Sequence, residues 1–162
     1  MMSWLRRRLV APLTTLLMQG VAPERLALGV AIGIVVGNIP LLGTSTVLCA
    51  LIALRFRLNL PTMQLVQALM APTQLLLILP FVRLGEWLLR APPQPLSVEA
   101  GLALLANGFW QAVVVLWEAI MHASCAWGLV APFAIFVIYR ILVPVFEHAA
   151  EKIASRSATL AR

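Results

Sequence analysis

The chain has 162 residues, of which 62% are hydrophobic and only 11% are charged. A soluble domain of this length carries about 25% charged residues, so the composition excludes an ordinary soluble domain and predicts one all-α membrane domain, residues 1–162. The net charge of +6 comes from basic residues that flank apolar runs, which indicates anionic membrane headgroups, and not nucleic acid, as the partner.

The sequence of residues 1–20 predicts a helix that lies in the membrane interface. Three arginines, Arg6 to Arg8, would lie among the headgroups while Trp4 and several leucines face lipid. A basic start before an apolar run also resembles a signal peptide. However, Pro12 interrupts that run at once, and no cleavage site precedes a polar mature domain, so we expect an interfacial helix.

Residues 21–57 form an apolar stretch with helix breakers at its centre. One helix is expected to begin at Pro23 and to end at a break that contains Pro40 and Gly43, and a second short helix follows. Each helix is too short for a full crossing. In lipid, a broken backbone survives only when it is packed in protein or lines a wet cavity, so this break points most directly to function.

Gly29, Gly33 and Gly37 recur every four residues along the first of these helices. A stripe of small residues lets helices approach closely in lipid, which predicts a helix-packing role for the three glycines. The alternative interpretation is a flexible inner helix of a gate.

Residues 58–90 repeat this plan, with a start at Pro61, a break at Pro72 and arginines at the end. The identity between the two segments is weak, so the repeat concerns the plan only. Gln67 and Gln74 are expected to bring their amides to the first break if the tips of the two segments meet.

The sequence of residues 97–148 predicts a transmembrane hairpin. A helix is expected to begin near Val98, a turn region spans residues 121–128, and a second helix ends at Phe146. Residues 149–162 are expected to form a polar tail.

The arginines indicate the topology. A single crossing by residues 26–54 would separate the arginines before it from Arg55 and Arg57, against the tendency of basic residues to face the cytoplasm. A re-entrant path that turns at Pro40 keeps them on one side, and a second turn at Pro72 keeps the later arginines there too. We therefore expect a multi-pass protein of the bacterial inner membrane with two re-entrant hairpins and both termini in the cytoplasm.

The two breaks also predict a ligand site. A second short helix that begins at Thr44, capped by its first Ser and Thr side chains, would point its N-terminus at a phosphate or carboxylate. The structural alternative is a capped kink with no ligand. The candidate ligand-binding residues are Asn38, Thr44, Ser45, Gln74, Arg83 and Arg140.

Two of these arginines also have simpler interpretations. Arg83 lies three residues before Glu86, which is the spacing of an anchoring ion pair. Arg140 lies in an apolar run, where a charge usually faces the bundle interior, and its partner there would be Glu118 or a bound phosphate. The alternative is that its side chain extends to the membrane interface.

The sequence predicts no catalytic residue, metal site or cofactor. Asp is absent, so no Ser-His-Asp set is available, and the glycines have helical spacing in place of a phosphate-binding loop. Glu118 and His122 share a helix face, but two ligands make a weak metal site.

The run from Pro23 to Gly33, followed by Gly37, Pro40, Gly43 and Asn59, resembles the bacterial membrane family called domain of unknown function 2062. The resemblance covers about residues 20–90. It departs at the second break, where the family usually has Asn-Pro and this chain has Ala71-Pro72. The resemblance implies a small integral membrane protein and no particular activity. Paired re-entrant hairpins are also similar in plan to bacterial families thought to flip lipid phosphates.

Two functions are expected from these features. The first is a transporter-like or lipid-handling protein, homo-oligomeric, with an anion or lipid-phosphate site at the hairpin tips. The second is a non-catalytic accessory or assembly subunit that packs against a larger membrane complex through the glycines. A polar cavity at the tips would favour the first function, and polar groups packed tightly against one another would favour the second. An intramembrane enzyme is a third hypothesis with less support.

Overall fold

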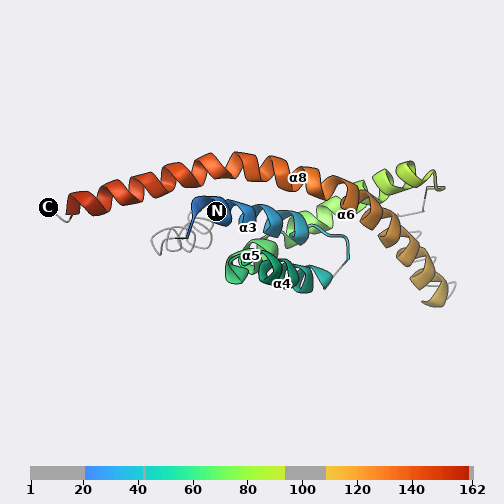
Figure 1. Ribbon diagram of the computed structural model, residues 1–162. Helices are drawn as coiled ribbons and strands as arrows, with labels where there is room; N and C mark the ends of the chain where they lie inside the picture. The colour runs from blue at the N-terminus through green and yellow to red at the C-terminus, as the bar shows by residue number, and fades with distance from the viewer. Residues whose placement is uncertain (1–20, 42, 94–108, 161–162) are drawn as a thin grey trace.

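The computed structural model describes residues 21–41, 43–93 and 109–160, so the expected interfacial helix of residues 1–20 lies outside the described residues. The described residues are helical and contain no strand, which confirms the all-α class (Figure 1). The helices are α3 (Pro23–Gly37), α4 (Thr44–Phe56), α5 (Leu60–Leu69), α6 (Ala71–Leu89) and α8 (Phe109–Leu160).

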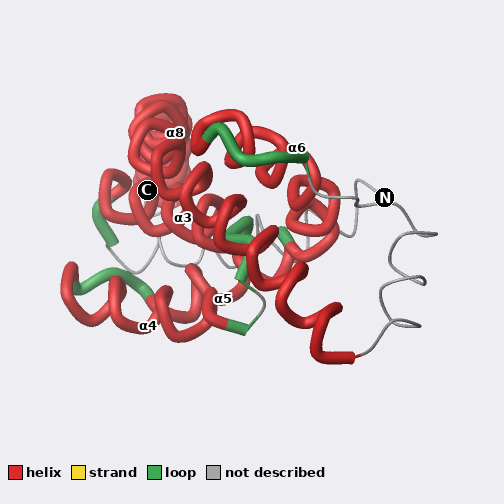
Figure 2. The backbone as a smooth tube through the Cα atoms, turned by 90° about the vertical axis from the view of Figure 1, so that its right-hand side faces the viewer, coloured by secondary structure: helices red, strands yellow, loops and turns green. Residues whose placement is uncertain are grey.

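Helix α3 is the central helix of the described fold. Figure 2 shows it between α8 on one side and the pair α4 and α5 on the other. Ten of its 15 residues are buried. The expected start is confirmed: Pro23 lies in the first turn, where its missing N–H costs no hydrogen bond, and Glu24 there complements the helix dipole.

Two glycines of α3 let α5 approach at backbone distance. A Cβ atom added to Gly33 would lie 3.0 Å from the carbonyl oxygen of Met63, and one added to Gly37 would lie 2.9 Å from Cβ of Met70. At Gly29 the nearest atom is Cγ of Met63 at 3.7 Å, an ordinary contact. Close packing of α3 on α5 therefore depends on Gly33 and Gly37, whereas Gly29 leaves room for a methyl group.

Helix α3 contributes to two apolar clusters on different faces. One joins it to α5 and to the C-terminal half of α8, and contains Leu26, Ala27, Val30, Val66 and Phe146. The other joins it to α4 and α5, and contains Ile32, Val36, Cys49, Ala53 and Met63. Because α3 takes part in both clusters, it fixes α4, α5 and α8 relative to one another.

The first broken segment is a helix–loop–helix, with α4 doubling back along α3 after the break at residues 38–43 (Figure 1). Gly43, with φ of 87°, precedes α4 in the left-handed conformation that glycine adopts without strain. The predicted capping by Ser and Thr is wrong, because no side chain caps α4. Instead, Oγ1 of Thr44 donates back to the carbonyl of Leu41 at 2.9 Å.

The second broken segment begins as predicted. Asn59 caps α5: its Oδ1 accepts hydrogen bonds from the backbone N–H of Thr62 at 3.0 Å and from its hydroxyl at 2.8 Å. The break falls at Met70, where α5 and α6 are bent by 65°, and α6 then continues through Pro80. This bend fits a broken crossing as well as a re-entrant segment, but it is no full reversal, and Figure 1 shows α6 leading away from α5.

The predicted C-terminal transmembrane hairpin is wrong in its described part. Helix α8 has 52 residues and continues without a break through the expected turn at residues 121–128 and through most of the expected polar tail. The hydroxyl of Ser124 donates to the carbonyl of Ile120 at 2.7 Å, so this polar side chain is satisfied inside the helix. Packing against both α3 and α6 supports the continuous helix.

Among the described helices, α8 is the one that is long and apolar enough to cross a membrane alone, over Leu116–Ser155, and α5 with α6 would qualify as one bent pair. Only 11% of the most apolar stretch of α8 is buried. Large apolar side chains are also exposed on α4 and α6, where Leu76 reaches 77%. The outer surface of the described helices is therefore rich in apolar side chains.

Alanine substitutions should separate the three glycines of α3. We expect Gly37→Ala to destabilise the protein by about 1–3 kcal/mol, since its methyl group overlaps Met70 and the α5 backbone. Gly29→Ala should be neutral or stabilising by up to about 1 kcal/mol, because alanine is the better helix former. Thermal unfolding of the purified variants in detergent measures both. Equal melting temperatures would contradict the tight α3–α5 approach.

Candidate functional site

The end of α3 has hydrogen-bond donors for the carbonyl groups that the break exposes. The side-chain amide of Asn38, through Nδ2, donates to the carbonyl of Ile34 at 2.7 Å. From α8, Nε1 of Trp127 donates to the carbonyl of Val35 at 3.1 Å. A helix leaves its last carbonyls short of partners, and Asn38 supplies a donor to Ile34. The carbonyl of Val35 also accepts the backbone N–H of Asn38 at 3.1 Å, so Trp127 adds a second donor there.

The second segment supplies further donors to the same break. Nε2 of Gln74 donates to the carbonyl of Ile39 at 2.6 Å, and Nε2 of Gln67 donates to the hydroxyls of Ser45 at 2.9 Å and Thr46 at 3.2 Å. The prediction that both glutamines reach the first break is confirmed. We call this set the polar junction: Asn38, Ser45, Thr46, Gln67 and Gln74.

The polar junction has engaged donors and spare acceptors. The side-chain amides of Asn38, Gln67 and Gln74 each donate at least one hydrogen bond within the protein. Buried atoms without a hydrogen-bond partner among the described residues include Oδ1 of Asn38 and Oε1 of Gln67, and both are acceptors. These two acceptor oxygens cannot donate to a phosphate, and the hydrogen bonds within the set join the first break to the second segment. The junction is better suited to bracing the two breaks.

The two arginines predicted for this site make contacts elsewhere. Nη1 of Arg83 lies 2.8 Å from Oε2 of Glu86, so the anchoring ion pair is confirmed. Arg140 is exposed, with its guanidinium 5.7 Å from the centroid of the Phe136 ring, and does not point into a bundle interior. Pairing of Arg140 with Glu118 is excluded, since both lie on α8 and are separated by about 33 Å at 1.5 Å per residue.

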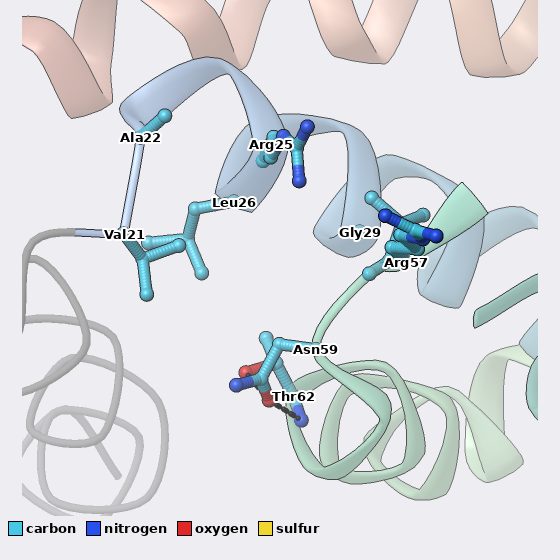
Figure 3. A pocket seen from close by; sticks show the side chains of 9 residues that line it. Val21, Ala22, Arg25, Leu26, Gly29, Arg57, Asn59 and Thr62 are labelled. Atoms are coloured by element: carbon cyan, nitrogen blue, oxygen red, sulfur yellow. Dashed lines mark hydrogen bonds between the residues drawn. The ribbon is translucent and has the colours of Figure 1, made fainter. Parts of the chain in front are cut away.

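A cavity of about 490 Å³ lies at the other end of α3 from the break, beside the starts of α3 and α5 (Figure 3). We call it the arginine pocket. Figure 3 shows Arg25 of α3 and Arg57, which follows α4, on one side of the opening, with Asn59 and Thr62 across from them. The lining residues are Val21, Ala22, Arg25, Leu26, Gly29, Arg57, Leu58, Asn59 and Thr62.

The arginine pocket carries positive charge without a carboxylate in its lining. Within the described ranges, neither Arg25 nor Arg57 belongs to an ion pair. Asn59 uses its Oδ1 to cap α5, which leaves its Nδ2 hydrogens as donors. Sequence reasoning used both arginines only to assign topology and missed this pocket. The signal in the sequence was the position of Arg57, at the end of the first broken segment and two residues before Asn59, which caps the next helix.

A second basic cavity, of about 670 Å³, lies at the end of α6 and is lined by Arg83, Glu86 and Arg90 among others. Its charge is partly offset, because the Glu86 carboxylate faces Arg83. This cavity is therefore a weaker anion site than the arginine pocket.

Helices α6 and α8 cross closely at Gly85, where an added Cβ would overlap the backbone of His122. The expected weak metal pair, Glu118 and His122, gains no third ligand: in the described part of the chain no three His, Cys, Asp or Glu side chains gather to hold an ion. The crossing is a packing contact in which a glycine admits a neighbouring backbone.

A family model described as "Uncharacterized protein conserved in bacteria (DUF2062)" matches residues 6–152, a longer stretch than the residues that suggested the resemblance. No curated protein and no solved structure gives a significant match.

Removal of one junction donor tests the bracing role. We expect Gln74→Leu to lower the free energy of unfolding by about 1–3 kcal/mol, because it leaves the buried Ile39 carbonyl without a donor. Gln64→Leu is the matched control, since Gln64 bonds the Thr46 carbonyl at an exposed position and water can replace it. Chemical unfolding of both variants in detergent measures the difference, and equal losses would contradict a buried brace.

Proposed function

This chain belongs to the DUF2062 family of bacterial proteins, and we propose that it is a multi-pass inner-membrane protein that binds and handles anionic lipids. The carrying observation is that apolar side chains cover the outside while polar groups pair with one another inside. Leu54, Leu76 and Phe133 are exposed, whereas Asn38 and Gln74 are buried. Such an arrangement suits a hydrocarbon solvent, in which every polar backbone group needs a partner within the protein.

The distribution of arginines supports an orientation for this proposal. Arg25 and Arg57 lie at one end of α3, and Phe146 shares an apolar cluster with Leu26 at that same end, so the C-terminal part of α8, with Lys152, lies there too.

Arg83 and Arg90 lie toward the other end, because α6 crosses α8 at His122, about 36 Å along the helix from Phe146, whereas a turn at Pro72 was expected to keep them on the first side. The first end has the larger number of basic residues, since Arg55 lies there as well. Basic residues favour the cytoplasmic side. We therefore place this end, with both termini, in the cytoplasm. The sequence led to the same placement through a C-terminal hairpin, which the continuous α8 replaces.

Two observations bear on the kind of role. The polar junction favours the alternative of an accessory subunit, because its side chains hydrogen-bond to one another and to the backbone of the first break. The open arginine pocket favours lipid handling, because it presents cationic donors that the described residues do not neutralise. We prefer lipid handling, with the anion site at the arginine pocket and no longer at the tips. The exposed apolar face of α8 would then contact lipid or a second copy of the chain.

Lipid retention tests the proposed function. The full chain, extracted in a mild detergent, should co-purify with phosphatidylglycerol or cardiolipin enriched about fivefold over phosphatidylethanolamine, given the arginine–phosphate attraction. Native mass spectrometry and lipid extraction measure the enrichment. Lipid in bulk proportions, together with stoichiometric co-purification of another membrane protein, would instead support the accessory role.

Cysteine labelling tests the orientation. In a variant without Cys49 and Cys125, we expect Arg55→Cys to react with a membrane-impermeant maleimide only after the cytoplasmic side is opened, because Arg55 is exposed at the basic end. Labelling of intact spheroplasts at this position would place the arginine pocket on the outer side and overturn the orientation.

A further inference from the structure

We propose that the arginine pocket binds a phosphate group, carried either by a lipid headgroup or by a free phosphate. The choice of a lipid headgroup as the source of the phosphate rests on the proposed function. The site is formed by three consecutive elements of the chain: the first turns of α3, the residue that follows α4, and the cap of α5.

The chemistry of the lining matches a phosphate. Two guanidinium groups, from Arg25 and Arg57, face the same cavity, and each presents a fork of N–H donors that fits phosphate oxygens in a bidentate way. The two arginines come from different helices, so a bound phosphate would join the start of α3 to the end of α4. It would also relieve the repulsion between two cations that share one cavity.

Neutral groups complete the pocket. Asn59 offers its Nδ2 hydrogens, since its oxygen is held by Thr62. Val21, Leu26 and Leu58 form an apolar part of the lining, which suits the glycerol and first acyl carbons of a lipid. The volume of about 490 Å³ lies within the usual range of small-molecule sites, roughly 300–1,000 Å³.

The backbone of Arg57 allows a substitution that should not disturb the fold. This residue has φ of 52° and ψ of 44°, the left-handed conformation that ends a helix and that glycine adopts most easily. A residue with a Cβ atom is strained there, so the arginine is unfavourable for local stability. Arg90, which ends α6, has the same conformation with φ of 53°, so this backbone geometry provides a test variant and is not evidence for a ligand.

This conformation also provides a variant that separates binding from folding. Arg57→Gly removes the guanidinium and relieves the left-handed strain, so its melting temperature should equal or exceed that of the unchanged protein. Its affinity for dihexanoyl phosphatidylglycerol should fall about tenfold or more, as expected for a lost charge-assisted contact. Arg25→Gln should weaken binding in the same direction.

Arg55→Gln is the matched control. It removes one positive charge two residues from Arg57, but Arg55 does not line the pocket and lies over the ring of Phe56, 5.6 Å from its centroid. Binding is measured by calorimetry on the purified full chain in non-ionic detergent. The control should change the affinity by less than about twofold, since an exposed charge acts weakly through water.

Two probes distinguish the sources of the phosphate. If dihexanoyl phosphatidylglycerol binds and inorganic phosphate neither binds nor competes with it, the pocket is a headgroup site. If inorganic phosphate binds and competes, the pocket is a free-phosphate site. Affinities that fall equally in Arg57→Gly and Arg55→Gln, or no binding of either probe to the unchanged protein, would overturn the proposal. Binding of inorganic phosphate alone would retain the site while removing support for lipid handling, so the two failures are distinguishable.

Discussion

The break after α3 exposes backbone carbonyls in an apolar setting, and the described fold is arranged around the donors that satisfy them. Asn38 supplies one donor locally, Gln74 supplies another from α6, and Trp127 supplies a third from α8. A buried carbonyl without a donor is costly, so the contact of Gln74 fixes α6 against the break. Trp127 fixes α8 there as well, by adding a donor to the Val35 carbonyl that the backbone N–H of Asn38 already reaches. The open positive site lies at the opposite end of the central helix, where Arg25 and Arg57 line a cavity.

Much of the local structure follows from the sequence because its signals act over a few residues. Pro23 and the capping Asn59 mark helix starts, and Gly33 and Gly37 mark a face that another helix can approach. The contact between the glutamines and the first break also follows from the sequence, since polar side chains in an apolar segment must find polar partners.

The remainder depends on contacts between distant residues. The sequence predicts a turn over residues 121–128, but α8 continues through it because the hydroxyl of Ser124 bonds back within the helix and because α3 and α6 pack along it. For Arg140 the sequence left open an interior charge and a side chain that extends to the interface, and the structure places it on the outer face beside Phe136. The arginine pocket needs Arg25 and Arg57 to come together, which only the return of α4 along α3 provides.

The length of α8 has a consequence for the surrounding bilayer. Between Glu118 and Glu147, Arg140 is the one charged side chain, and these 28 residues span about 42 Å, against a hydrocarbon thickness of about 30 Å. An upright helix would leave apolar surface in water, and ordinary tilts of about 20° remove only part of the excess. In the membrane placement that we propose, the lipids next to α8 must therefore thicken or the helix must incline steeply, so the protein would perturb the bilayer in which it resides.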